Sequence, residues 1–188
     1  VVKANAYGHG MEQVAKAALD HGAAMLGVAF CDEGLRLRQA GFTAPILLFG
    51  ALEAENADAV IEYDLQPTVF DTDTLLLLQE RAKRQGKTCR VHMKADTGMR
   101  RIGFVSPAAF AEALDLLPAC PNIAFAGLFT HFAVSEWEDQ SFTLQQGERF
   151  RAFIEAAHNR GHRPLLHAAN SGAILNQPAL QFDMVRGG

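Results

Sequence analysis

Short apolar runs alternate with longer amphipathic stretches along the whole chain. A run of roughly four to eight apolar residues bounded by Gly, Pro or Asp is typical of a buried strand, whereas apolar residues three and four positions apart predict a helix. The predicted strands cover Val1–Ala6, Met25–Phe30, Ile46–Gly50, Leu65–Val69, Thr88–Lys94, Ile123–Phe129, Pro164–Ala168 and Phe182–Val185. The clearest predicted helices cover Met11–His21, Asp32–Ala40, Thr72–Gln85, Pro107–Leu117 and the stretch from about Asp139 to Arg160.

This alternation predicts an α/β protein with parallel strands, because a helix between two strands returns the chain to the same end of the sheet. About eight strand–helix units indicate a (β/α)8 barrel of the TIM type. A doubly wound open sheet is the alternative, but its usual GxGxxG turn after the first strand is absent. In a barrel, chemically active residues are expected at the C-terminal ends of the strands.

Composition narrows the class of protein. The chain has 188 residues, 49% hydrophobic and 20% charged, with a net charge of −4, which suits one globular domain. The mild negative charge argues against nucleic acid or an anionic membrane as partner, since both attract a basic face. No run approaches the ~18 apolar residues of a spanning helix. The three distant cysteines predict core residues rather than disulfides or a zinc site.

No repeat, low-complexity tract or long linker divides the chain, so we expect a single domain. The sequence opens without Met inside an apparent strand and stops where another motif begins. We therefore expect an internal fragment of a longer protein, with a barrel truncated at both ends.

The opening VVKANAYGHG carries Lys3 from an apolar run into a Gly-rich turn. A lysine at a strand end is most often a salt-bridge partner. A partly buried amine can instead lose its proton and react with a carbonyl group. Both interpretations place Lys3 at the mouth of the barrel.

Four further polar groups follow predicted strands. The stretch KADTGMRRIG after Lys94 is by itself a solvated loop, and His131 is by itself a structural histidine. Asn170 and Ser171 predict a helix cap, although a hydroxyl at a helix N-terminus also suits a phosphate. Arg186, in VRGG, carries no meaning in isolation. Too few ligands converge anywhere for a metal site.

Taken in order, VVKANAYGHG, KADTGMRRIG, THFA, NSGA and VRGG resemble the sequence elements of bacterial alanine racemases. The five blocks extend over essentially the whole chain, which is identified as a member of this family. The resemblance implies that residues 1–188 are an incomplete barrel domain that binds pyridoxal 5'-phosphate. It also implies a β-rich C-terminal domain outside this sequence and a head-to-tail homodimer with active sites at the interface.

The same resemblance assigns residues to the cofactor. It implies that Lys3 holds the cofactor covalently and that Ser171, beside Asn170, binds the phosphate together with Tyr7 and a backbone amide around Gly188.

Other matched residues would face the cofactor ring. Arg101 matches the arginine that donates to the phenolic oxygen, and Lys94 matches a lysine that is often carbamylated and orients that arginine. A carbamate accepts an arginine fork, whereas an ammonium would repel it. His131 is expected to pack beside the ring and to orient Arg186, which matches the donor to the ring nitrogen.

The implied activity is racemisation of L-alanine and D-alanine in the cytoplasm, which supplies D-alanine for peptidoglycan. Lys3 would move the proton on one face of the substrate. The resemblance implies that the opposite face uses a tyrosine of the partner subunit's C-terminal part. Of the tyrosines in this sequence, Tyr7 matches a phosphate ligand and Tyr63 matches no active-site motif. We therefore expect the isolated fragment to be inactive.

Other functions stay open at this point. A serine or broad-specificity racemase would carry the same motifs. A non-catalytic pyridoxal-phosphate carrier would not need Arg101 or Arg186, and a decarboxylase of this fold type would favour a carboxylate in place of Arg186. A sugar-phosphate barrel enzyme explains the architecture but not the residues around Lys3.

Overall fold

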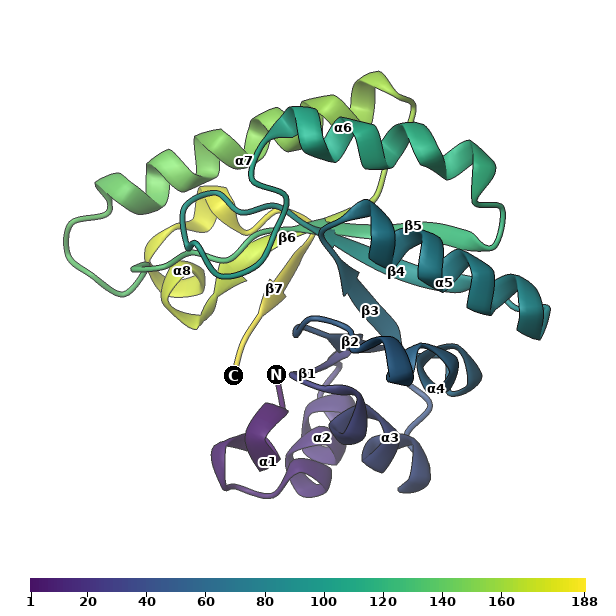
Figure 1. The fold of residues 1–188 in the computed structure, drawn as a ribbon. Coiled ribbons are helices and arrows are strands. Elements are labelled where there is room, and N and C mark those ends of the chain that lie inside the picture. Colours follow the sequence, from purple (N-terminus) through teal and green to yellow (C-terminus); the bar gives the residue numbers. More distant parts are fainter.

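The computed structural model describes all residues 1–188, which form a parallel sheet curved into a nearly closed barrel with helices outside it (Figure 1). Each strand pairs in parallel with the next along the chain. The strands are β1 Leu26–Val28, β2 Ile46–Leu48, β3 Gln66–Val69, β4 Cys89–Lys94, β5 Ile123–Phe129, β6 Leu165–Asn170 and β7 Met184–Arg186. The predicted α/β barrel is confirmed, with seven assigned strands rather than eight.

The helices cover the outer face of the sheet, except for the short left-handed α1 (Lys3–Tyr7) beside the cavity. They are α1 Lys3–Tyr7, α2 Met11–Asp20, α3 Cys31–Gln39, α4 Ala57–Glu62, α5 Thr72–Gln85, α6 Pro107–Leu116, α7 Ser141–Asn159 and α8 Ser171–Asn176, with 3-10 turns η1 Ala54–Asn56, η2 Leu117–Ala119 and η3 Pro178–Leu180. All five clearest predicted helices are confirmed to within two residues at each end. Local chemistry defines these ends: the Asp71 side chain caps α5 by accepting from Thr74 N, and Gly86 ends it in a left-handed conformation.

The first predicted strand, Val1–Ala6, is wrong beyond Val2. The Val2 amide donates to Gly27 O of β1 (2.8 Å), and the Val1 ammonium donates to Gly187 O just after β7 (2.7 Å). These two residues therefore lie between the two edges of the sheet, where both chain ends meet (Figure 1). The next stretch, Ala4 to Tyr7, is a left-handed turn with φ between 51° and 54°. A left-handed run of non-glycine residues costs about 1–2 kcal/mol per residue and is therefore rare. The apolar pattern gives no sign of it.

The interior of the barrel is polar, in contrast to the layer between sheet and helices. Outside the sheet, Phe110 packs against Phe104, Phe125 and Phe153. The inner face of the sheet carries buried polar side chains, among them Gln66, Thr68, His92, Lys94, His167 and Arg186. The three cysteines are buried and unpaired, as predicted. None of the helices combines the length and apolarity needed to cross a bilayer.

Candidate functional site

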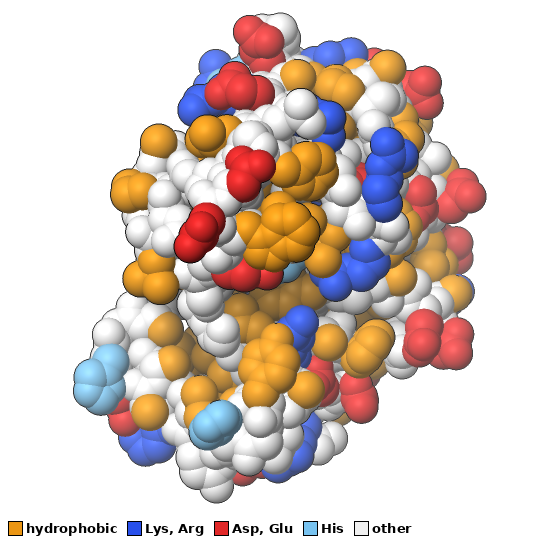
Figure 2. Space-filling view, turned by 90° about the vertical axis from the view of Figure 1, so that its left-hand side faces the viewer, with side chains coloured by type: hydrophobic (Ala, Val, Ile, Leu, Met, Phe, Trp, Pro, Cys, Tyr) orange, Lys and Arg blue, Asp and Glu red, His pale blue; other side chains and the backbone are white.

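A cavity of about 330 Å³ opens where the strands end. Figure 2 shows the hollow in this face of the molecule, with basic and hydrophobic side chains at its edge. Every candidate site residue from the sequence lines this cavity: Lys3, Tyr7, Lys94, Arg101, His131, Asn170, Ser171, Arg186 and Gly188. The grouping follows from the topology, because parallel strands all deliver their C-terminal ends to one edge.

The cavity is strongly cationic. Lys3, Lys94, Arg101 and Arg186 line it, and Glu136 is the only carboxylate among its lining residues. None of the four cations forms an ion pair with a carboxylate, so a salt-bridging role for Lys3 has no support. Such an excess of positive charge in a concave site attracts an anionic ligand.

Lys3 stands at the start of the left-handed turn, which two side-chain hydrogen bonds hold in place. The Ala4 amide donates to Glu33 Oε1 (2.6 Å), and the Met11 amide donates to Asn5 Oδ1 (2.9 Å). The second Glu33 oxygen accepts from the amides of Ala29 (2.7 Å) and Phe30 (3.2 Å), which fixes the carboxylate to the end of β1. The Glu33 carboxylate therefore anchors the turn to α3 and to the end of β1.

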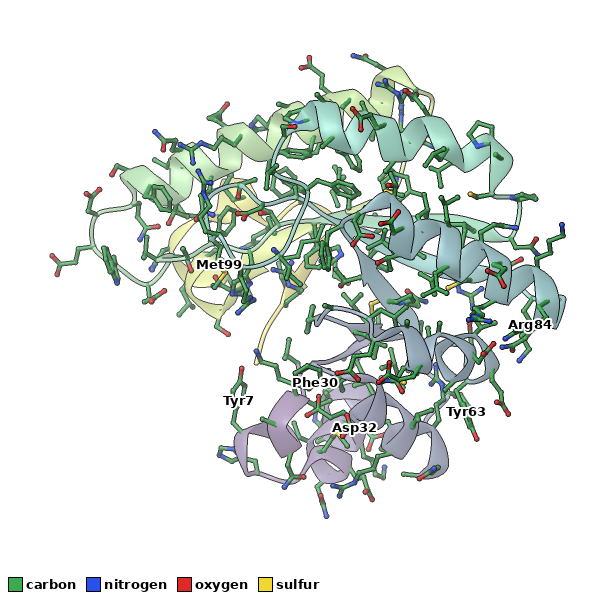
Figure 3. All side chains as sticks on the ribbon, in the orientation of Figure 1. Tyr7, Phe30, Asp32, Tyr63, Arg84 and Met99 are labelled. Carbon is green, nitrogen blue, oxygen red and sulfur yellow. The ribbon has the colours of Figure 1, made fainter.

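Tyr7 also projects from this turn, toward the mouth of the barrel and on the same side as Met99, whereas Tyr63 lies on the far side of the molecule (Figure 3). The Lys3 Nζ lies 5.7 Å from the centre of the Tyr7 ring, whose side chain is exposed. Of the two tyrosines, only Tyr7 belongs to the cavity.

Lys94 ends β4 and is only 2% exposed. Its Nζ donates to Ile102 O (2.5 Å) and faces no carboxylate at ion-pair distance. Burial lowers the pKa of Lys94 to about 8, with the positive charges of Arg101 and Arg186 acting in the same direction and Asp96 opposing them. About a tenth of Lys94 is therefore the neutral, nucleophilic amine at pH 7, far more than for an ordinary lysine. Arg101 lies exposed at the rim of the cavity.

Arg186 ends β7 and is held on one side by three acceptors. Its Nη1 donates to His167 Nδ1 (3.0 Å), and its Nη2 donates to Thr130 O and Ala168 O (both 2.9 Å). Burial lowers the pKa of Arg186 to about 10, so the guanidinium stays charged at neutral pH. Its Nε forms no hydrogen bond within the protein, and the side chain lines the cavity, so this donor is available to a ligand.

His131 lies beside this guanidinium, with its Nδ1 at 3.3 Å from Arg186 Nη2. Burial, with Arg186 as the largest of four nearby cations, lowers the pKa of His131 to about 3. The imidazole is therefore neutral and, because arginine only donates, accepts at Nδ1.

The cavity is also lined by small polar groups. Ser171 Oγ donates to Gly188 O (2.9 Å), and the Gly188 amide lies 3.3 Å from the same oxygen. Asn170 Oδ1 accepts from the Ala173 amide (3.2 Å), which confirms the predicted helix cap, and from Ser135 Oγ (2.6 Å).

Sequence reasoning missed several residues that shape the site. Phe49 and Phe129 line the cavity, Glu33 holds the Lys3 turn, and His92 and His167 lie behind Arg186. A signal existed for the first histidine: His92 and Lys94 are two apart on one strand, so both point to the same face. Nothing local marks Glu33, which acts on a segment 29 residues away.

Comparison with known proteins gives one consistent result. The family model "Alanine racemase, N-terminal domain" matches residues 1–188. An alanine racemase of Methanococcus maripaludis is 39% identical over the whole chain, which covers 51% of that protein. The structure of alanine racemase from Clostridium difficile 630 superposes with a TM-score of 0.96 at 35% identity, and this chain covers 49% of it.

A histidine racemase from Leuconostoc mesenteroides superposes with a TM-score of 0.91 at 28% identity, and the chain covers 50% of it. The chain thus spans about half the length of the curated relatives it matches.

Proposed function

The chain belongs to the family of alanine racemase N-terminal domains, and from this premise we propose that it is the pyridoxal 5'-phosphate-binding barrel of a racemase that interconverts L-alanine and D-alanine. The observation that carries the proposal is the single cavity that gathers Lys3, free of any carboxylate partner, with Arg101 and Arg186.

The residues present fit the cofactor. Its phosphate and phenolic oxygens are anionic, and the cavity carries four cations against one carboxylate. Lys3 would hold it covalently, and Ser171, Tyr7 and the Gly188 amide would bind its phosphate. Arg101 would donate to its phenolic oxygen. When bound, the cofactor stabilises negative charge that develops at the substrate α-carbon.

Two side chains would define the ring environment. His131 would pack beside the ring and orient Arg186 through the contact between its Nδ1 and Nη2. Arg186 would direct its free Nε to the ring nitrogen. Because a guanidinium does not give up its proton at working pH, this nitrogen would stay unprotonated, which limits how strongly the ring withdraws charge.

Lys3 would also move the proton of the substrate. The Lys3 amine, when free, would accept the α-proton from one face of one enantiomer and donate a proton to that face when the other enantiomer reacts. Reaction on the opposite face needs a second donor, and Tyr63 lies outside the cavity (Figure 3). We infer that a tyrosine from the C-terminal domain of a partner subunit supplies it in a head-to-tail homodimer, and that residues 1–188 alone do not racemise.

Lys94 would become negatively charged by reaction with carbon dioxide. The neutral amine adds to the carbon of CO₂ and releases one proton, which leaves a carbamate with a single negative charge. The lowered pKa of Lys94, about 8, supports this reaction near neutral pH. The carbamate would then accept hydrogen bonds from Arg101, in place of the repulsion between two cations.

Two alternatives remain as second candidates. The likeness to a histidine racemase indicates that this barrel serves side chains other than methyl, which keeps a serine or broad-specificity racemase open. A non-catalytic carrier would need Lys3 and the phosphate site alone, and Arg101 and Arg186 argue against it. In the racemase proposal, the product would supply D-alanine for peptidoglycan precursors made in the cytoplasm.

The test uses the purified full-length protein with pyridoxal phosphate. L-Alanine, L-serine and L-histidine are incubated separately in heavy water, and α-proton exchange is followed together with chiral analysis of the product. Exchange with formation of D-alanine that is lost in Lys3→Ala, but kept in the exposed control Lys16→Ala, supports the racemase. Borohydride-trapped cofactor on Lys3 without exchange would indicate the carrier, and no cofactor on Lys3 would overturn the assignment.

A further inference from the structure

Four polar side chains form a chain of hydrogen bonds inside the barrel, which we call the file: Arg186, His167, His92 and Gln66. Arg186 Nη1 lies 3.0 Å from His167 Nδ1, His167 Nε2 lies 2.9 Å from His92 Nδ1, and His92 Nε2 lies 3.0 Å from Gln66 Oε1. These residues come from β7, β6, β4 and β3. Each is more than nine-tenths buried, so water does not complete any of these bonds.

The direction of the file follows from its first member. Arginine only donates, so His167 Nδ1 must be an acceptor and the proton of His167 must sit on Nε2. This proton is donated to His92 Nδ1, which places the proton of His92 on Nε2, facing the Gln66 carbonyl. Burial lowers the pKa of both histidines, that of His92 to about 4, so each ring is neutral and has one donor and one acceptor. Every ring nitrogen is thereby satisfied.

The surroundings are built for these two rings. Gly127 on β5 faces His92, and a Cβ at this position would overlap the imidazole. His167 stacks on Phe129, a wall of the cavity, with ring centres 4.8 Å apart and an angle of 5° between the planes. Neither ring can turn over without breaking this packing.

The file explains how a buried guanidinium is held without a carboxylate. Its acceptors are two backbone carbonyls and the rings of His131 and His167, and each bond in the file points its negative end toward Arg186. Aligned hydrogen bonds polarise one another in a low-dielectric interior. A carboxylate in this position would fix Arg186 equally well but would cancel its charge.

We propose that Gln66, His92 and His167 are positioning residues whose one-directional hydrogen bonds hold Arg186 as a charged donor with Nε directed into the cavity. The identity of the ligand at Nε rests on the proposed function, whereas the proton positions in the file do not. Gln66 is the far end of the file: its carbonyl accepts the His92 Nε2–H and so completes the proton order that Arg186 begins.

The experiment measures the imidazole ¹⁵N shifts of the full-length protein labelled at histidine, before and after addition of pyridoxal phosphate. We expect both buried rings to be protonated on Nε2 and unprotonated on Nδ1 in the cofactor-free wild type. Gln66→Glu places a carboxylate against His92, and we expect it to produce an imidazolium signal. The His92 Nδ1–H would then donate to His167, which reverses the direction of the hydrogen bond between the two rings. Gln39→Glu, on the exposed face of α3, is the matched control.

Cofactor binding supplies the second measurement. Loss of one hydrogen-bond acceptor from Arg186 is expected to raise the dissociation constant of the ligand that Arg186 binds by about tenfold. We therefore expect Gln66→Glu to raise the pyridoxal-phosphate Kd about tenfold and to move the absorption band of the bound cofactor, with Gln39→Glu unchanged. Gln66→Met, which removes the acceptor without adding charge, serves if the glutamate variant does not fold.

A wild-type ring with its proton on Nδ1 would overturn the proposal, as would a Gln66 variant indistinguishable from Gln39→Glu in both measurements. If the two Nε2–H tautomers are found but pyridoxal phosphate does not bind, the proposed function fails and the file stands.

Discussion

Glu33 is predicted to keep Lys3 in place, although its side chain does not line the cavity. Its two oxygens accept three backbone amides, from Ala4 at one oxygen and from Ala29 and Phe30 at the other. In Glu33→Gln, one oxygen becomes an NH₂ group, which cannot accept. Either the Ala4 bond or the pair of bonds to the end of β1 is then lost.

The expected cost follows from the number and type of bonds. A hydrogen bond to a charged group contributes about 1.5–3 kcal/mol, and an amide facing an NH₂ group is left unpaired. We expect the free energy of unfolding to fall by about 2–3 kcal/mol, since Glu33 is half-buried. For a protein of this size that lowers Tm by roughly 4–12 °C. The left-handed residues Ala4 to Tyr7 would also lose an anchor that offsets their backbone strain.

The assay compares Glu33→Gln with Asp32→Asn in the full-length protein, by urea unfolding and by titration with pyridoxal phosphate. Asp32 is the neighbouring, exposed carboxylate on the same helix, so its amide variant makes the same change of charge. We expect weaker cofactor binding and lower stability in Glu33→Gln alone. Equal values for the two variants in both measurements would refute the anchoring role of Glu33.

Three further predictions concern the barrel interior. The pKa of His92 is lowered to about 4 and that of His131 to about 3, so the unfolded chain binds more protons than the folded chain below about pH 6.5. The free energy of unfolding should therefore fall as pH drops from 6.5 to 4, by about 3 kcal/mol for His92. Urea unfolding at pH 5 and pH 7 tests this, and equal values would contradict it. The pKa of Lys94, about 8, lies below its value in the unfolded chain. Without carbon dioxide, the free energy of unfolding should therefore rise by about 3 kcal/mol from pH 8 to pH 10.5. Lys94→Met should remove this pH dependence in the same assay. Gly127→Ala should cost about 1–3 kcal/mol by forcing its Cβ against the His92 ring, and an unchanged Tm would show that the ring can move.

The strand pattern predicted most of the barrel because each apolar run is local and several of the crossover helices carry their own N-caps. Thr72–Gln85 is an example: its cap at Asp71 and its end at Gly86 can both be read from the sequence. The left-handed turn after Val2 could not be read, since Ala, Asn and Tyr adopt it only under tertiary constraint. That constraint includes the Glu33 carboxylate, which no local rule connects to Lys3.

The candidate site was predictable for a topological reason. Lys94, Asn170 and Arg186 each end a strand, and parallel strands place such residues at one mouth. The file of His92 and His167 was not predictable, because the two rings lie 75 residues apart and meet only through the closure of the barrel. Strand ends therefore reveal which residues reach the ligand, whereas the residues that hold them are found only in the folded chain.

The charge of the cavity also connects ligand binding to stability. Arg101 and Arg186 lower the pKa of Lys94, and all four cations lower that of His131, so the free site already opposes further positive charge. An anionic ligand relieves this repulsion only in the folded state. By mass action, such a ligand at a hundred times its Kd adds about 2.7 kcal/mol to the free energy of unfolding. A barrel that gathers four cations without a partner carboxylate is therefore expected to gain more from its ligand than a site balanced by acidic side chains.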